Sequence, residues 1–108
     1  MFTREALIKY ISDYVKACND LGIYFDRVIL FGSYARNTPH KWSDIDLALA
    51  SESFSGFRPD DRGMLAKATM KFVDIEPHTF PTDYFEKGDP FIEEIVKTGI
   101  ELKVLETV

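Results

Sequence analysis

Two aspartates separated by one residue, Asp44 and Asp46, lie in a segment that otherwise has the apolar pattern of a buried strand, SDIDLALA. Aspartate is rare in strands, and a buried carboxylate without a partner is costly, so another group must compensate these charges. Because side chains alternate along a strand, we expect both carboxylates on one face, roughly 6–7 Å apart. Ala48 and Ala50 follow on that face and leave room above it. This arrangement suits a hard cation.

A later segment repeats the pattern. Residues 71–80, KFVDIEPHTF, alternate apolar and polar side chains and predict another strand. We expect Val73 to point into the core and three polar side chains to share the opposite face, namely Asp74, Glu76 and His78. If the two strands are neighbours, the carboxylates converge and repel one another, and Mg²⁺ removes that conflict because it binds carboxylate oxygens. His78 by itself is expected to be a surface histidine.

A candidate anion-binding turn precedes the aspartates. Gly32 and Ser33 follow residues 24–31, YFDRVILF, which predict the first strand. Glycine lets the backbone approach a ligand closely, and serine offers a hydroxyl and an N–H group to a phosphate. We expect residues 33–36 to form a helical turn, whose N-terminus favours anions, and Arg36 to supply a cation. Groups that can bind an anion therefore lie at the end of one strand, and groups that can bind a metal ion lie at the start of the next. A metal–nucleotide complex requires both.

Each feature alone has an ordinary explanation. An Asp-x-Asp pair is most often the solvated face of a strand, a Gly-Ser pair is usually just a turn, and Arg36 alone would be a surface charge. The combination of these features is a more specific sign of a nucleotide-binding site than any of them alone. A strand is followed along the chain by the Gly-Ser turn, then by Arg36, the aspartate pair and a further acid on a later strand.

Length and composition limit the classes of protein to consider. The 108 residues are 45% hydrophobic and 29% charged, which predicts one globular domain over residues 1–108. The net charge of −5 argues against a broad basic surface, so we expect no direct nucleic-acid partner. The single cysteine, Cys18, indicates a reducing compartment, and no apolar run approaches the length of a membrane span. We therefore expect a cytoplasmic protein without membrane contact.

Capping residues and periodicity predict the remaining elements. Thr3 caps a helix over about residues 4–21, and Gly22 ends it. The other expected elements are a helix over about 60–70, a short helical turn in 81–88, a helix over 90–98 that Asp89 caps, and a strand over 100–106. This order, α-β-β-α-β-α-β, predicts an α+β fold with a mixed sheet of about four strands and helices packed on one face.

The motifs resemble those of a known superfamily. GSYAR followed by SDIDL is similar to the signature G-S-x-A-R-G-x(n)-S-D-x-D of the nucleotidyltransferases typified by DNA polymerase beta. The length resembles that of the minimal nucleotidyltransferase (MNT) domain proteins, and the resemblance extends from Ile29 to Glu101. Asn37 stands where the family usually has glycine, and asparagine tolerates left-handed backbone angles.

The resemblance implies a nucleotidyltransferase fold, two Mg²⁺ ions and ATP as the substrate. The acids it assigns to catalysis and metal binding are Asp44, Asp46 and Asp74. The residues it assigns to the nucleotide are Gly32, Ser33, Arg36 and Ser43. The family's hydrophobic-Asp-hydrophobic pattern favours Asp74, although Glu76 is the other candidate for the third acid. The reaction would be in-line attack of an acceptor hydroxyl on the α-phosphorus of a nucleoside triphosphate, with release of pyrophosphate.

The resemblance also implies a partner. MNT proteins are commonly paired with a helical HEPN protein as antitoxin and toxin, and the implied activity is AMP transfer to a tyrosine of the HEPN RNase. A catalytically silent antitoxin that acts by binding alone is the alternative. Transfer to a small molecule ranks third, because larger family members hold such acceptors with a second domain. The sequence is also compatible with a homo-oligomer.

Overall fold

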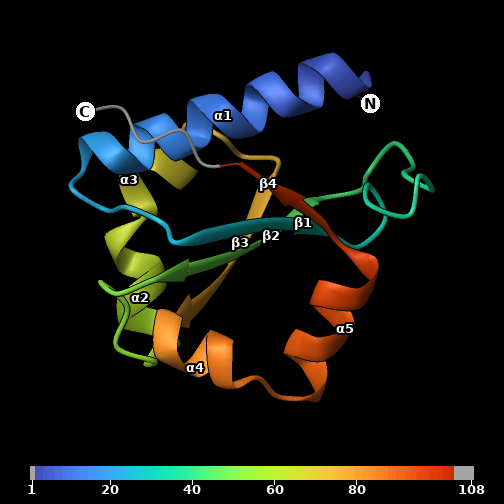
Figure 1. Ribbon diagram of the computed structural model, residues 1–108. Coiled ribbons are helices and arrows are strands. Elements are labelled where there is room, and N and C mark those ends of the chain that lie inside the picture. The colour runs from blue at the N-terminus through green and yellow to red at the C-terminus, as the bar shows by residue number, and fades with distance from the viewer. Residues whose placement is uncertain (1, 104–108) are drawn as a thin grey trace.

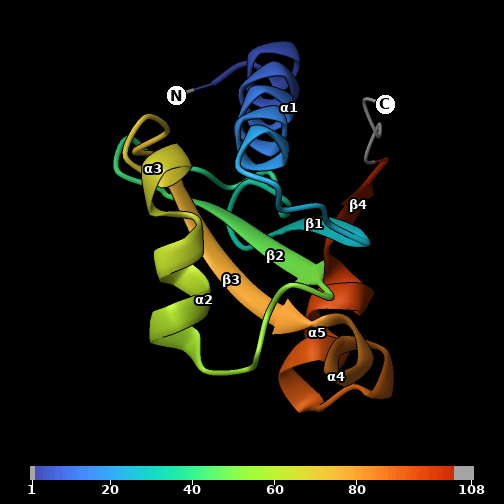
Figure 2. The same cartoon turned by 90° about the vertical axis from the view of Figure 1, so that its left-hand side faces the viewer.

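The computed structural model describes residues 2–103 and contains a four-stranded mixed sheet (Figures 1 and 2). Its strands are β1 (Arg27–Phe31), β2 (Ile45–Ser51), β3 (Ile75–Pro81) and β4 (Ile100–Leu102). Across the sheet they lie in the order β3-β2-β1-β4. β1 is antiparallel to β2 and β4, whereas β2 and β3 are parallel. The predicted α+β class with a mixed sheet of four strands is confirmed.

Helices cover both faces of this sheet. They are α1 (Arg4–Asp20), α2 (Arg58–Met64), α3 (Ala66–Thr69), α4 (Thr82–Lys87) and α5 (Pro90–Thr98). Figure 1 shows α1 above the sheet and α4 and α5 below it. One apolar cluster joins Leu47 to α1, and a second joins Ile29, Ala48 and Ala50 to Ile92. The expectation of helices on one face is therefore wrong, because the room above the two alanines is filled by α4 and α5.

The predicted helix caps are confirmed. Oγ1 of Thr3 accepts a hydrogen bond from the N–H of Ala6 at 3.1 Å, and Oδ1 of Asp89 accepts one from Ile92 at 2.7 Å. Gly22 follows α1 with a φ of +86°, the left-handed angle that glycine adopts without steric cost. Local sequence rules thus account for the ends of α1 and for the start of α5.

Other boundaries differ from the prediction. The helix expected over residues 60–70 begins at Arg58 and divides at Leu65, and residues 82–87 form a helix of their own, so the order becomes α-β-β-α-α-β-α-α-β. The strand expected from residue 71 begins only at Ile75, because hydrogen-bonded turns continue after α3. Val73 is therefore 76% exposed, and its predicted inward position is wrong. Of the last predicted strand, residues 104–106 lie outside the described residues.

The buried side chains of α1 complete the larger core. Cys18 lies there with no exposed surface, and burial raises the pKa of its thiol to about 11, so it is a small core residue as expected. Within residues 2–103, no helix has both the length and the apolar character that crossing a membrane requires.

Candidate functional site

The turn after β1 lies directly against the start of β2. The antiparallel register pairs Phe31 with Asp46, so the next residue, Gly32, is beside the Asp46 carboxylate. Gly32 has a φ of +76°. A Cβ atom at this position would collide with Oδ2 of Asp46 and lie 3.2 Å from its Cγ. Glycine is therefore required for the backbone angle and also for space, and the predicted anion-binding turn contacts one of the predicted acids.

Residues 33–37 form hydrogen-bonded turns rather than a regular helix. The N–H of Arg36 donates to the carbonyl of Gly32 at 3.1 Å, and that of Thr38 donates to the carbonyl of Ser33 at 2.9 Å. Asn37 has a φ of +58°, which confirms that asparagine adopts the left-handed angle here. Arg36 is exposed and forms no ion pair within residues 2–103, so its charge is available on this turn.

The Asp46 carboxylate also contacts a histidine that the sequence placed at the surface. The parallel register pairs Asp46 with Glu76, so His78 follows on the same face. Nε2 of His78 lies 3.2 Å from Oδ1 of Asp46, and both side chains are about three-quarters buried. The imidazole ring packs edge-on against Phe31, with ring centroids 4.9 Å apart. His78 thus belongs to the site, and its expected surface position is wrong.

The two candidates for the third acid lie in different surroundings. Glu76 is level with Asp46 and forms an ion pair with Arg62 at 3.0 Å. Asp74 lies one residue before β3, and its N–H donates to the hydroxyl of Tyr10 in α1 at 3.4 Å. Burial and the nearby negative charge of Asp74 raise the pKa of that hydroxyl, so the Asp74 carboxylate lies close to α1. Asp74 as the third acid stays a prediction.

The loop before β2 positions the first acid. The hydroxyl of Ser43 accepts a hydrogen bond from the N–H of His40 at 2.8 Å, and the N–H of Ser43 donates to the carbonyl of His40 at 2.9 Å. Asp44 follows and is exposed. The Ser43 hydroxyl therefore closes the loop, whereas no hydrogen bond of the Ser33 hydroxyl occurs within residues 2–103, which leaves it open to a phosphate.

The donor set fits Mg²⁺. Within residues 2–103, no group of three histidine, cysteine, aspartate or glutamate side chains encloses a possible metal position. Mg²⁺ does not need such a cage, because it is usually bound by one or two carboxylates together with phosphate oxygens and water. Asp44 and Asp46 are two carboxylates of this kind, one exposed and one partly buried beside the Gly-Ser turn. They can hold a cation that also contacts a triphosphate.

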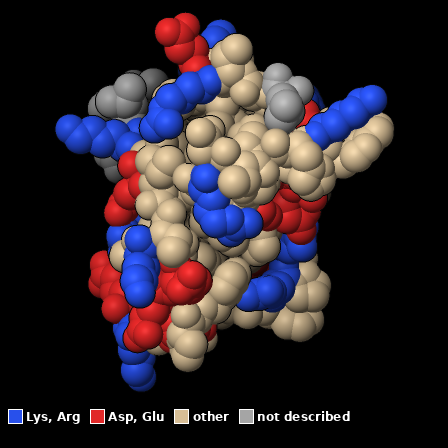
Figure 3. All heavy atoms as spheres, turned by 90° about the vertical axis from the view of Figure 1, so that its right-hand side faces the viewer, with Lys and Arg blue, Asp and Glu red and all other residues tan. Residues whose placement is uncertain are grey.

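Charge on the side of the molecule that carries the turn after β1 is mixed. Figure 3 shows acidic and basic side chains interspersed on this face, with uncharged surface between them. The described residues of this face form no continuous basic surface. A single nucleotide needs only the local donors of the turn.

A comparison with protein families agrees with this geometry. A family model described as a nucleotidyltransferase domain matches residues 11–102, a span that includes the Gly-Ser turn, Asp44, Asp46 and all of β3. A comparison with curated proteins found no significant match. The family model covers most of the chain, and its superfamily is the one that the motifs resemble. The chain belongs to the nucleotidyltransferase domain family of the DNA polymerase beta-like superfamily.

Proposed function

We propose that the protein transfers AMP from ATP to a tyrosine hydroxyl of a helical HEPN-type toxin and thereby silences that toxin. Membership of the family supports nucleotidyl transfer in general. The observation that carries the proposal is the contact between Gly32 and Asp46, because it joins a phosphate-binding turn to a cation-binding acid. A triphosphate held by the turn has its phosphates next to that carboxylate.

The reaction forms one bond and breaks another. The acceptor oxygen bonds to the α-phosphorus of ATP, the bond from that phosphorus to the bridging oxygen breaks, and pyrophosphate leaves. Gly32 leaves space for the phosphates, Ser33 donates its hydroxyl, and Arg36 supplies positive charge. Asp44 and Asp46 would hold Mg²⁺, which would supply positive charge to the phosphate oxygens.

The acceptor proton must pass to a base before or during bond formation. Glu76 is the carboxylate of β3 that lies level with Asp46 on the same face of the sheet. We assign the proton to Glu76 on this geometry, with Asp74 as the alternative that the family pattern favours. A carboxylate in this position removes the proton from a hydroxyl that approaches along the same face.

The test follows a phosphate label. The protein is incubated with the product of the neighbouring gene, Mg²⁺ and ATP labelled at the α-phosphate, and the partner is examined for covalent label. We expect label from α-labelled ATP and none from γ-labelled ATP, which separates AMP transfer from phosphorylation. Asp44→Asn with Asp46→Asn should abolish the label, whereas Asp20→Asn, at an exposed position of α1, should not.

A silent antitoxin is the second candidate. One observation favours it, since Asp46 and Glu76 already have the side-chain partners His78 and Arg62 without any ligand. On this hypothesis neither form of labelled ATP marks the partner. The Asp44→Asn/Asp46→Asn protein would then neutralise the toxin as well as the wild type does.

A further inference from the structure

An exposed aromatic side chain borders the candidate active site. Phe91 is the second residue of α5 and is 43% exposed. Its ring lies edge-on to that of Phe31, the last residue of β1, with ring centroids 5.8 Å apart. Phe31 pairs with Asp46 and directly precedes Gly32. Phe31 therefore connects Phe91 both to the candidate phosphate-binding turn and to a candidate metal-binding acid.

His78 forms a second connection between Phe91 and the carboxylate of Asp46. The centroid of its imidazole ring lies 6.2 Å from that of Phe91 and 4.9 Å from that of Phe31. Through Nε2, the same imidazole lies 3.2 Å from Oδ1 of Asp46. All three ring-bearing residues are at least partly exposed. Together they form an aromatic surface that reaches the Asp46 carboxylate.

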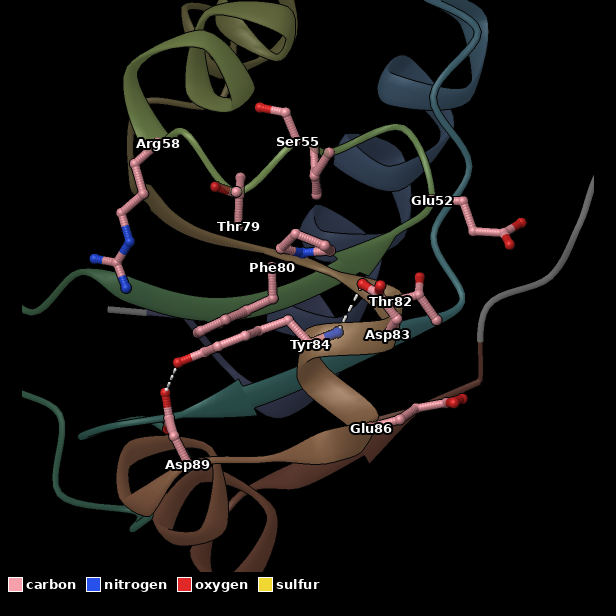
Figure 4. Close-up of a pocket in the computed structure, with 13 residues that line it drawn as sticks. Glu52, Ser55, Arg58, Thr79, Phe80, Thr82, Asp83, Tyr84, Glu86 and Asp89 are labelled. Carbon is pink, nitrogen blue, oxygen red and sulfur yellow. Dashed lines mark hydrogen bonds between the residues drawn. The ribbon is translucent and has the colours of Figure 1, made fainter.

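Hydrogen bonds on both sides of Phe91 hold the start of α5 in place. The hydroxyl of Tyr84 donates to the carboxylate of Asp89 (Figure 4), and this carboxylate accepts a further hydrogen bond from the N–H of Ile92 at 2.7 Å. The buried ring of Phe80 supports Phe91, with ring centroids 6.3 Å apart. Because the backbone and the ring of Phe91 are both supported before any ligand arrives, a planar group can pack on it at a small cost in entropy.

The two neighbours of Asp46 in the sheet divide the site into two sides. Glu76 of β3 is level with Asp46 on one side, and Phe31 of β1 is level with it on the other. Glu76, to which the acceptor proton is assigned, places the attacking hydroxyl on the β3 side. The turn for the phosphates follows Phe31 on the β1 side, where Phe91 packs against Phe31. The exposed ring is therefore placed for the base of the nucleotide rather than for the acceptor.

We propose that Phe91 stacks against the nucleobase of the bound nucleoside triphosphate, so that α5 supplies the base-binding surface. The inference rests on the proposed function, because it requires a triphosphate at the Gly-Ser turn. Every nucleobase has a π face, and its stacking on an aromatic side chain contributes to binding without hydrogen bonds to the base edges. In a nucleotide the ribose separates the base from the α-phosphate, and in this site His78 separates Phe91 from Asp46.

The test compares two ligands that share a triphosphate chain, only one of which carries a base. The ligands are α,β-methylene ATP, which cannot be cleaved at the bond that AMP transfer breaks, and inorganic tripolyphosphate. Each is titrated into the protein with Mg²⁺ by calorimetry, without the partner. We expect Phe91→Ala to weaken binding of the ATP analogue about tenfold and to leave binding of tripolyphosphate unchanged. Phe91→Leu keeps an apolar side chain without a π face and should show the same selective loss.

Tyr24→Ala is the matched control for the removal of an exposed aromatic side chain. Tyr24 is 52% exposed and precedes β1, whereas Phe31 ends that strand. This variant should bind both ligands like the wild type. Phe91→Tyr retains the aromatic face and should also bind the ATP analogue like the wild type.

The outcomes separate this inference from the proposed function. The titrations measure binding alone, so a selective loss in Phe91→Ala supports base stacking even where no partner receives label. Binding of the ATP analogue that is unchanged in Phe91→Ala would overturn the inference and leave the ring to the acceptor or to packing. Equal weakening of both ligands in Phe91→Leu would assign Phe91 a structural role and would overturn it too. A wild-type protein that does not bind the analogue would have the same consequence.

Discussion

The carboxylate of Asp46 occupies the space in which a side chain at residue 32 would begin. Gly32 also has a φ of +76°, so two separate physical reasons exclude other residues there. The candidate phosphate-binding turn and the candidate metal-binding acid are thereby fixed relative to each other. A substitution at residue 32 must therefore disturb both parts of the site together.

Gly32→Ala should lower AMP transfer by about 100-fold or more, because the new methyl group displaces the Asp46 carboxylate. The strained backbone angle should also reduce the free energy of unfolding by about 1–3 kcal/mol. Gly63→Ala is the matched control, since nothing lies within 4 Å of a Cβ there and its φ is not positive. That variant should keep activity and gain about 0.5–1 kcal/mol. Label transfer and urea unfolding measure the two effects.

His78 should act as a positioning residue for Asp46. Its Nε2 atom contacts Oδ1 of Asp46, and its ring is held against Phe31. His78→Phe keeps the packing but removes the polar contact, and we expect about tenfold more Mg²⁺ to be needed for half-maximal transfer. His78→Gln retains a polar group and should be affected less. If both variants need the same Mg²⁺ concentration as the wild type, His78 contributes packing alone.

Asp89 should make stability depend on pH. The hydrogen bond from the Tyr84 hydroxyl, followed by that from the Ile92 N–H, lowers the pKa of Asp89 below its ordinary value of 3.8. A carboxylate with a lowered folded pKa stabilises the protein above its ordinary pKa, and this stability is lost as pH falls through the folded value. The difference in unfolding midpoint between wild type and Asp89→Asn should therefore be constant near neutral pH and shrink below pH 3.8.

Asp89→Ala provides the comparison that isolates the helix cap. Asparagine still offers an oxygen to the N–H of Ile92, whereas alanine offers none. Asp89→Ala should consequently lower the unfolding midpoint more than Asp89→Asn at neutral pH, and part of that loss should persist in acid. Equal midpoints for the two variants would assign the effect to charge rather than to the cap.

The parts of the fold and of the candidate site that follow from local rules could be predicted from the sequence. Thr3 and Asp89 cap helices because a side-chain oxygen must satisfy the first free N–H groups. Asn37 takes a left-handed angle because its short polar side chain tolerates it. The Gly-Ser turn and the aspartate pair are likewise short patterns, and each depends on residues that are neighbours in the chain.

The parts that depend on long-range pairing could not be predicted. Alternation along each strand does not define the register of β2 against β3, and this register alone brings His78 and Glu76 level with the Asp46 region. The small side chains of Ala48 and Ala50 predict open space above this face, but Ile92 from α5, distant in the sequence, packs there. The alternating pattern also predicts a buried Val73, but this residue lies in the turns that follow α3, before β3 begins at Ile75.

From the register of β2 against β3 we expect Glu76 rather than Asp74 to be the base. Glu76→Gln should lower the rate of AMP transfer by about 100-fold or more, because the carboxylate level with Asp46 is lost while side-chain size is kept. Asp74→Asn should lower it far less, since that carboxylate lies near Tyr10. Arg62→Gln controls for the ion pair and should retain most of the rate if Glu76 acts as a base. Single-turnover label transfer measures the three rates. A large loss in Asp74→Asn with a small one in Glu76→Gln would return the role to Asp74, as the family pattern suggests.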